Sequence, residues 1–233
     1  MSDPTKVEIP VSIRSRLEEH QSRLKDPAYR AELERAERDA AERDRQDRVA
    51  EDLARRNAAF VASGVPRRVR DLLASDAIEA TPTLARVQEW VKGLAVDPSQ
   101  WCLVLSGHKG SGKSVAAGWW LKHAGVGGVR RWHTAPELSL LDWYDGAFTK
   151  VAELDGPLVI DDLGSEFSDG KGFFQQRLDA LIDARYREYR PTLITTNIAA
   201  KELGARYGER VVDRMREGGT IFETRATSMR GSR

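Results

Sequence analysis

The sequence predicts an α/β protein, in which helices cover both faces of a parallel sheet and a charged helix precedes the sheet. Two observations lead to this prediction. After residue 63, short apolar runs alternate with helical stretches, which is typical of a parallel sheet covered on both faces. Before it, residues 14–62 contain no glycine and carry twelve basic and twelve acidic residues, which favours a helix exposed to solvent.

The composition excludes several classes of protein and several kinds of site. With 233 residues the chain can form one sizeable core and an appendage. Its formal net charge of +1 provides no general attraction for nucleic acid, so any such binding must be local. The single cysteine, Cys102, excludes a disulfide framework or a cysteine zinc site within one chain. No apolar run approaches the length of about 20 residues that a membrane span requires. We therefore expect a cytoplasmic protein without membrane contact.

Residues 1–62 are predicted to form a charged helical N-terminal arm, with Pro27 separating a short helix from a long one. Oppositely charged residues recur four positions apart, and each such pair stabilises a helix by about 0.2–0.5 kcal/mol. The pairs are Glu34/Arg38, Asp39/Arg43, Asp44/Arg48 and Glu51/Arg55. The apolar stripe is thin, so the arm is either a solvated helix or a segment that docks a partner or forms a coiled coil.

Residues 63–233 are predicted to form the second domain, because Gly64 and Pro66 end the charged helix and residues 63–71 form a break. Apolar runs predict strands at 101–107, 128–135, 157–164, 191–197 and 219–226. Helical periodicity predicts helices at 81–94, 113–125, 135–154 and 173–189, and two short helices within 199–218. The first of these helices has Thr81 or Thr83 as a possible N-cap.

A phosphate-binding loop is predicted between the strand at 101–107 and the helix that follows it. Residues 107–114, with the sequence GHKGSGKS, fit the pattern G-x-x-x-x-G-K-[ST]. Glycines let backbone N–H groups turn toward phosphate oxygens, lysine reaches the β and γ phosphates, and the serine hydroxyl ligates Mg²⁺. The predicted nucleotide-binding residues are Gly107, Gly110, Ser111, Gly112, Lys113, Ser114 and Val115.

Polar side chains end the next two buried strands. We expect Asp161 to hold Mg²⁺ together with Ser114, because carboxylates at a buried strand end are costly without a cation. Either Asp162 or Glu166 would polarise the attacking water. Asn197 would hold that water or touch the γ phosphate. The glycine loop, the two aspartates and Asn197 together predict ATP hydrolysis. Lys113 would take part by contacting the phosphate that reacts.

The C-terminal segment is rich in arginine: residues 206–233 contain seven. Arg210 and Arg214 lie four positions apart and therefore on one helix face, while Val211 and Met215 turn inward. Either arginine is a candidate for reaching the γ phosphate of a neighbouring subunit as a trans arginine finger.

Five stretches occur in an order that resembles a known family: SGVPRRVRD, LVLSGHKGSGKS, LVIDDLGSE, RYREYRPTLITTN and GERVVDRMREGG. Over about residues 60–233, the chain is similar to the DnaC/DnaI-type helicase loaders and the IstB-like transposition ATPases, which are AAA+ ATPases. The resemblance implies a Walker B motif at Asp161 and Asp162, and a sensor-1 residue at Asn197. It also implies a trans finger at Arg210 or Arg214, and a sensor-2 type arginine at Arg230.

The resemblance further implies a function. Such a protein would bind ATP and Mg²⁺, self-associate through AAA+ interfaces, bind single-stranded DNA and load a replicative DNA helicase held by the N-terminal arm. The alternative is an IstB-like ATPase partner of a transposase. The arm departs from the DnaI type, whose N-terminal domain carries zinc, because this chain lacks the cysteines. Residues 128–135 combine basic and aromatic side chains, a combination that suits binding of single-stranded nucleic acid. The alternative is a tryptophan in the core beside arginines on the surface.

Overall fold

The structure is a computed structural model that describes residues 11–75, 81–124, 128–142, 146–167, 170 and 172–224. The chain divides into two compact units, Met1–Arg55 and Arg56–Arg233. The predicted division fell at residue 62, but Phe60 near the end of the long helix is buried in the core of the second unit. No helix in these described ranges is long and apolar enough to cross a membrane.

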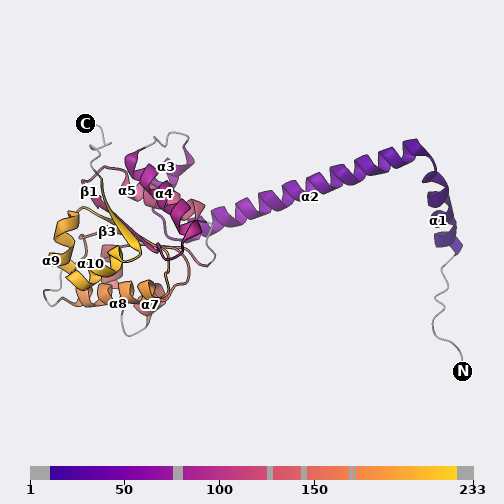
Figure 1. The fold of residues 1–233 in the computed structure, drawn as a ribbon. Helices are drawn as coiled ribbons and strands as arrows, with labels where there is room; N and C mark the ends of the chain where they lie inside the picture. Colours follow the sequence, from indigo (N-terminus) through magenta and orange to yellow (C-terminus); the bar gives the residue numbers. More distant parts are fainter. Residues whose placement is uncertain are drawn as a thin grey trace, which may run out of the picture. The chain divides into compact units, whose positions relative to one another are not determined.

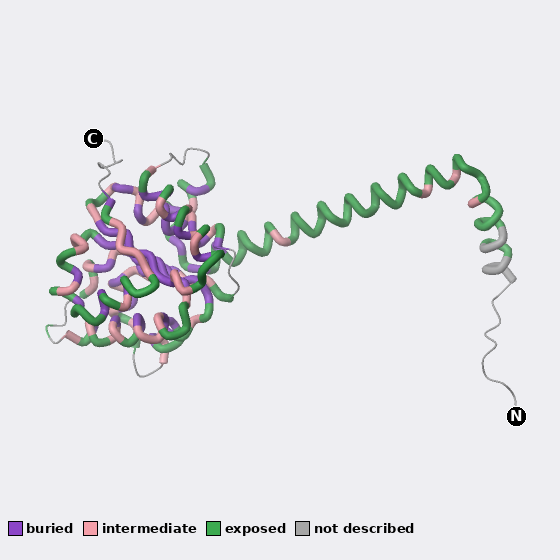
Figure 2. Tube along the Cα trace, in the orientation of Figure 1, coloured by how far each residue is buried: buried purple, intermediate pink, exposed green. Residues whose placement is uncertain are grey.

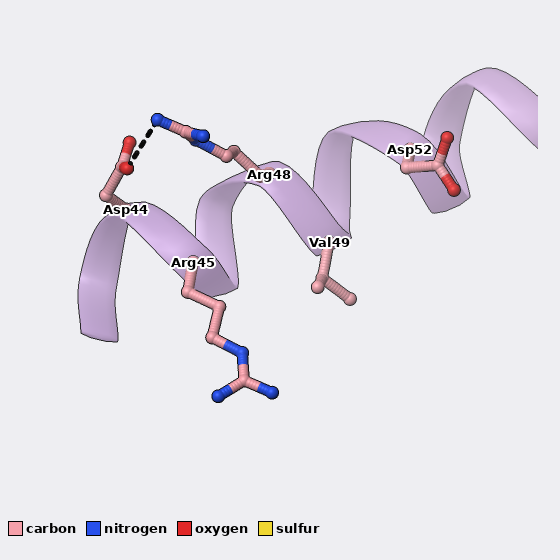
Figure 3. Close-up of a pocket in the computed structure, with 5 residues that line it drawn as sticks. All are labelled: Asp44, Arg45, Arg48, Val49 and Asp52. Atoms are coloured by element: carbon pink, nitrogen blue, oxygen red, sulfur yellow. Dashed lines mark ion pairs between the residues drawn. The ribbon is translucent and has the colours of Figure 1, made fainter. Parts of the chain in front are cut away.

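The first unit consists of α1 (Val11–Arg23) and most of α2 (Pro27–Ala62), so the break at Pro27 occurs as predicted. Residues of α2 in this unit are almost all exposed, as the green part of the tube shows (Figure 2). Figure 3 shows the Asp44–Arg48 ion pair, 2.8 Å long, on one side of α2, with Arg45 and Val49 on another. Arg55 pairs with Asp52 rather than with Glu51, because positions three apart also face each other.

The second unit is built on a five-stranded sheet in the order β2-β3-β4-β1-β5, and all paired strands are parallel. The strands are β1 (Cys102–Gly107), β2 (Arg131–Thr134), β3 (Leu158–Leu163), β4 (Thr192–Thr196) and β5 (Gly219–Thr224). Residues of β1 alternate between two hydrophobic clusters: Cys102 and Val104 face one, and Leu103 and Leu105 face the other. This alternation shows that both faces of the sheet are covered.

Helices form the two covering layers (Figure 1). One cluster packs β1 against α3 (Arg67–Ala74), α4 (Pro82–Val96) and α5 (Lys113–His123). The other involves α6 (Ala135–Leu140), α7 (Ala147–Ala152), α8 (Phe173–Arg187), α9 (Leu203–Tyr207) and α10 (Glu209–Arg216). A 3₁₀ turn, η1 (Ala200–Glu202), precedes α9. The predicted α/β class, with a parallel sheet between two helical layers, is confirmed.

Two helix predictions were wrong. A single helix was expected over 135–154, but α6 ends at Leu140 and α7 begins after Gly146, whose φ is +73°. The sequence predicts a break over 63–71; the break covers only 63–66, and α3 begins at Arg67. It forms because Val69 and Leu73, one helical turn apart, are both buried. A Cβ on Gly118 of α5 would lie 2.5 Å from Val69 Cγ1, so α3 and α5 pack closely.

Arg185 is the buried arginine of the RYREYRP segment. Its side chain is fully buried and donates to Thr192 Oγ1 and to the carbonyl oxygens of Leu154, Gly156 and Pro191, at 2.6–2.9 Å. Burial lowers the pKa of Arg185 to about 9, which still leaves the guanidinium charged at neutral pH. The Arg185 side chain therefore links the segments that lead into β3 and β4. These segments lie at the opposite end of the strands from Asp161, Asp162 and Asn197.

Candidate nucleotide-binding site

The loop after β1 has the conformation that its glycines permit. Gly107, Gly110 and Gly112 all have positive φ, at +135°, +88° and +81°, and Gly112 is the N-cap of α5. A Cβ on Gly107 would lie 2.5 Å from Thr224 Cγ2, so this position also requires glycine for close packing against β5. The loop residues therefore lie at the start of α5, where backbone N–H groups and the helix dipole favour an anion.

Thr83 supports this loop, a role that the sequence did not reveal. The N-cap of α4 is Thr81, whose hydroxyl accepts from Leu84 N at 3.0 Å. Thr83 is instead fully buried; its hydroxyl donates to Ser111 O at 3.0 Å and lies 3.1 Å from Thr224 Oγ1. Helix α4 and strand β5 thus hold the loop through one hydroxyl. A threonine in the first turn of a helix gives no signal that separates this role from capping.

Lys113 lies at the centre of the site. Its ammonium group donates to Gly107 O at 2.7 Å, His108 O at 2.8 Å and Asn197 Oδ1 at 3.1 Å. Burial lowers the pKa of Lys113, and the nearby carboxylates of Asp161 and Asp162 oppose that shift. The lysine is thus held by neutral carbonyl oxygens, which a bound phosphate would replace with charged partners.

Ser114 and Asp161 form a pair with oxygen ligands suited to Mg²⁺. Ser114 Oγ donates to Asp161 Oδ1 at 2.9 Å, and Thr195 Oγ1 donates to the same atom at 2.6 Å. Burial raises the pKa of Asp161, against the effect of these two hydrogen bonds. Within the described ranges, no three His, Cys, Asp or Glu side chains form a metal-binding group. A cation here would use this carboxylate and hydroxyl, with phosphate and water oxygens completing the shell.

Asp162 has an unusual backbone for a strand residue. Its φ is +58°, and the register between β3 and β4 shifts between Ile160 and Leu163. Its N–H donates to Thr195 Oγ1 at 2.9 Å. Because of this irregularity, two consecutive carboxylates both contact polar groups at the end of β4, whereas a regular strand would point them to opposite faces.

Asn197 joins the two halves of the site. It follows β4, which lies between β1 and β3 in the sheet. Its Oδ1 accepts from Lys113 at 3.1 Å, and its Nδ2 donates to Asp162 Oδ1 at 2.6 Å. The structure therefore brings together the phosphate loop, both aspartates and Asn197, as the strand order requires.

Glu166 points elsewhere. Its side chain is only 3% exposed and accepts hydrogen bonds from Arg206 at 2.6 Å, Tyr207 OH at 2.9 Å and Gly164 N at 2.7 Å. Burial alone would raise the pKa of Glu166, but these hydrogen bonds together lower it. Of the two carboxylates, Asp162 contacts Asn197, which also contacts Lys113, whereas Glu166 contacts α9.

The two candidate arginines of α10 differ in their surroundings. Arg214 is 15% exposed; it donates to Asp179 at 2.9 Å and pairs with Asp183 on α8. Arg210 is 68% exposed and has only loose contacts, of 3.8 and 4.0 Å, with the same two carboxylates. Val211 and Met215 are buried, as predicted. Arg230, the predicted sensor-2 residue, lies outside the described residues.

Trp132 does not provide a platform for base stacking. It is 3% exposed and belongs to the core between β2, α3 and α5. Arg130 donates to the carbonyl oxygens of Leu121, Lys122 and Ala124, at the end of α5. The stacking interpretation of residues 128–135 is therefore wrong for Trp132, and the alternative of a core tryptophan is confirmed. The pocket drawn in Figure 3 is lined by α2 alone and has no residue in common with the site.

Some solved structures resemble this chain in fold, although its sequence has no close match. No protein-family model and no curated protein matches the sequence. Among solved structures, the DnaC helicase loader is 21% identical with a TM-score of 0.52, and the match covers 68% of this chain and 99% of that one. DnaI is 20% identical with a TM-score of 0.53, covering 69% and 94%. A candidate primosome component from Streptococcus pyogenes serotype M3 is 19% identical with a TM-score of 0.55, covering 74% and 98%.

This chain shares the fold of these three solved structures. Within this fold, Lys113 follows the end of β1, Asp161 and Asp162 lie at the end of β3, and Asn197 contacts both Lys113 and Asp162.

Proposed function

We propose that the chain is an AAA+ ATPase that binds ATP with Mg²⁺ and hydrolyses it. The observation that carries this proposal is the hydrogen-bonded series Lys113–Asn197–Asp162, with the Ser114–Asp161 pair beside it. The start of α5 and the glycine loop would hold the phosphates, and Lys113 would balance their charge. Ser114 and Asp161 would hold Mg²⁺, which would supply positive charge against the charge that develops on the phosphates. Asp162 would accept a proton from water that Asn197 orients.

The site would be completed by a second copy of the chain, with Arg210 as the trans arginine finger. This choice between the two candidates follows from their contacts. Arg214 is nearly buried in pairs with α8, and its removal would take the closest cation from Asp179 and one of two close cations from Asp183. Arg210 is two-thirds exposed and could exchange its loose pairs for a phosphate at little cost.

We further propose that the protein loads a replicative helicase, binds single-stranded DNA and uses the N-terminal arm to contact its partner. The support is the likeness in fold to the DnaC helicase loader, to DnaI and to a candidate primosome component. The long exposed face of α2 offers a surface for such a partner. The likeness to a helicase loader supports this proposal, and the alternative is an ATPase partner of a transposase.

The test is the ATPase rate per chain, measured against protein concentration with and without single-stranded DNA. A rate that rises with concentration, and rises again with DNA, supports a shared site and loader-type assembly. A constant rate that ignores DNA contradicts both. A pull-down with replicative helicase, comparing the full chain with a chain lacking residues 1–55, tests the arm; equal recovery contradicts its role.

A further inference from the structure

Glu166 makes a compact set of contacts that the proposed hydrolysis does not use. Its Oε1 accepts from Arg206 Nη2, Arg206 Nε and Tyr207 OH at 2.6, 3.1 and 2.9 Å, and its Oε2 accepts from Gly164 N at 2.7 Å. Arg206 Nη2 also donates to Gly164 O at 3.0 Å. We call Glu166, Gly164, Arg206 and Tyr207 the Glu166 clamp. It joins the turn that follows β3 to helix α9.

On one side, the clamp is continuous with the reacting end of the site. The turn begins at Asp162, whose carbonyl oxygen accepts from Ser165 N at 3.0 Å and from Ser165 Oγ at 2.6 Å. Gly164 has a φ of +110°, and a Cβ there would lie 2.7 Å from Ile198 Cδ1. The turn is therefore tightly packed. A displacement of Asp162 would be passed to Glu166 rather than absorbed between them.

On the other side, the clamp reaches the helix that carries the proposed finger. Tyr207 is the last residue of α9, and only Gly208 separates it from Glu209, the first residue of α10. Tyr207 is 5% exposed and Leu203 fully buried, so α9 is firmly packed. The ion pairs of Arg214 attach α10 to α8, which supplies none of the site residues described above. The clamp, in contrast, attaches α9, which leads directly into α10, to the turn that contains Asp162 and Glu166.

We propose that Glu166 is a positioning residue that couples nucleotide occupancy of one chain to the orientation of its own α10, and so of Arg210. This inference rests on the proposed function. A bound phosphate would take Lys113 from the carbonyls and from Asn197 Oδ1. Asn197 also donates to Asp162, so their contact would change with it. The left-handed backbone of Asp162 is strained, so a change in its contacts would favour a move to a less strained conformation. The contacts would thus differ between the empty and the occupied state, as coupling requires.

The first test measures α10 without relying on hydrolysis. Amide hydrogen exchange of residues 203–216 is compared with and without a non-hydrolysable ATP analogue, in the wild-type chain, in Glu166→Ala and in a matched control, Glu153→Ala, an exposed glutamate. The analogue should change exchange in the wild type and the control, and leave it unchanged in Glu166→Ala at saturating analogue. An equal change in Glu166→Ala, or none in a wild type that binds the analogue, overturns the proposal.

Analogue binding is measured separately by fluorescence titration, so a wild type that fails to bind identifies failure of the proposed function itself. If Glu166→Ala does not fold, Glu166→Gln and Tyr207→Phe keep the volume and weaken the clamp. Each should reduce the analogue-dependent change in exchange, and an undiminished change in both overturns the proposal.

The second test assigns the effect to one side of the interface. An Asp161→Asn chain keeps the phosphate loop and α10 but loses Mg²⁺-dependent hydrolysis at its own site, and an Arg210→Ala chain keeps the site but loses the finger; mixing them should restore hydrolysis. Adding Glu166→Ala to the Asp161→Asn chain should lower the restored rate at least tenfold, since a misplacement of about 1 Å costs on the order of 100-fold. Loss only when Glu166→Ala is added to the Arg210→Ala chain would identify a role within its own site and overturn the proposal, as would no loss in either.

Discussion

At the residue scale, the site depends on a few polar side chains that a regular strand would not bring together. Asp162 contacts Asn197 only because its backbone is left-handed, with a φ of +58°. Such a conformation costs of order 1–3 kcal/mol in a residue other than glycine, although aspartate tolerates it better than most. Backbone strain of this kind is common at functional sites, which supports a role for Asp162 in the reaction.

Lys113→Ala is expected to abolish nucleotide binding and hydrolysis, because the charge at the centre of the loop is lost. The measurement is titration with a fluorescent ATP analogue, and Lys109→Ala on the same loop serves as the control. Normal binding and hydrolysis by Lys113→Ala would show that the loop does not bind phosphate.

Asp161→Asn is expected to stabilise the chain at neutral pH while weakening Mg²⁺-dependent activity. Burial raises the pKa of Asp161, so the folded chain binds this proton more tightly than the unfolded chain. The carboxyl therefore stabilises the fold below its unfolded pKa, and that contribution is lost as pH rises through the folded pKa. Each kcal/mol gained corresponds to a rise in Tm of about 2–4 °C.

Thermal melts without Mg²⁺ at several pH values provide the measurement for Asp161→Asn. Its advantage over the wild type should shrink as the pH falls from about 7 toward about 4. An advantage that stays constant with pH would mean that the ionised carboxylate is not the cause.

At the element scale, the helix pair α8 and α10 combines packing with charge. Val211, Val212 and Met215 are buried on the inner face of α10, and Arg214 lies between Asp179 and Asp183 on α8. These contacts fix α10 within its own chain. They also give the two arginines of α10 different surroundings, because Arg214 is held in close ion pairs and Arg210 is exposed.

Arg214→Ala is expected to lower the free energy of unfolding by about 1–3 kcal/mol, because Asp179 loses its closest cation and Asp183 loses one of its two close ones. Arg210→Ala should change the free energy of unfolding by less than about 0.5 kcal/mol, as exposed pairs contribute little. For ATP hydrolysis we expect the opposite ranking: Arg210→Ala should have the larger effect. It should lower the rate of hydrolysis and leave nucleotide affinity nearly intact. Urea unfolding and ATPase assays on both variants provide the comparison; a stable, fully active Arg210→Ala chain would exclude it as the finger.

Elements with a simple period could be predicted from the sequence, and those set by distant contacts could not. The apolar runs predicted β1, β3 and β4, and their polar ends predicted the meeting of Lys113, Asp161 and Asn197. The sequence could not separate α6 from α7, because the helical pattern continues across the break. Nor could it reveal that Thr83 supports Ser111 or that Glu166 is enclosed by α9, because those contacts join residues 28 and 40 positions apart or more.

At the scale of the whole molecule, every described residue of the candidate nucleotide-binding site lies in the second unit. Its boundary lies at Arg56, and the last turns of α2 contribute Phe60 to its core. The predicted boundary at residue 63 would remove that side chain. A buried phenylalanine contributes several kcal/mol to stability.

A chain that begins at Arg56 is expected to fold and to bind ATP as the full chain does, whereas a chain that begins at Ser63 should be less stable by about 3–5 kcal/mol through loss of Phe60. Circular dichroism melts and nucleotide titration on both truncations provide the measurement. Equal stability of the two would place the domain boundary where the sequence suggested it.

The position of Cys102 has a practical consequence for such experiments. This cysteine is fully buried in β1, and burial raises the pKa of its thiol to about 12, so thiol-reactive dyes should not label it in the folded chain. It is also the only cysteine in the sequence. A dye attached to a cysteine introduced at Arg216, an exposed position at the end of α10, would therefore report on that helix alone. The native protein is thus ready for single-site labelling without removal of its own thiol.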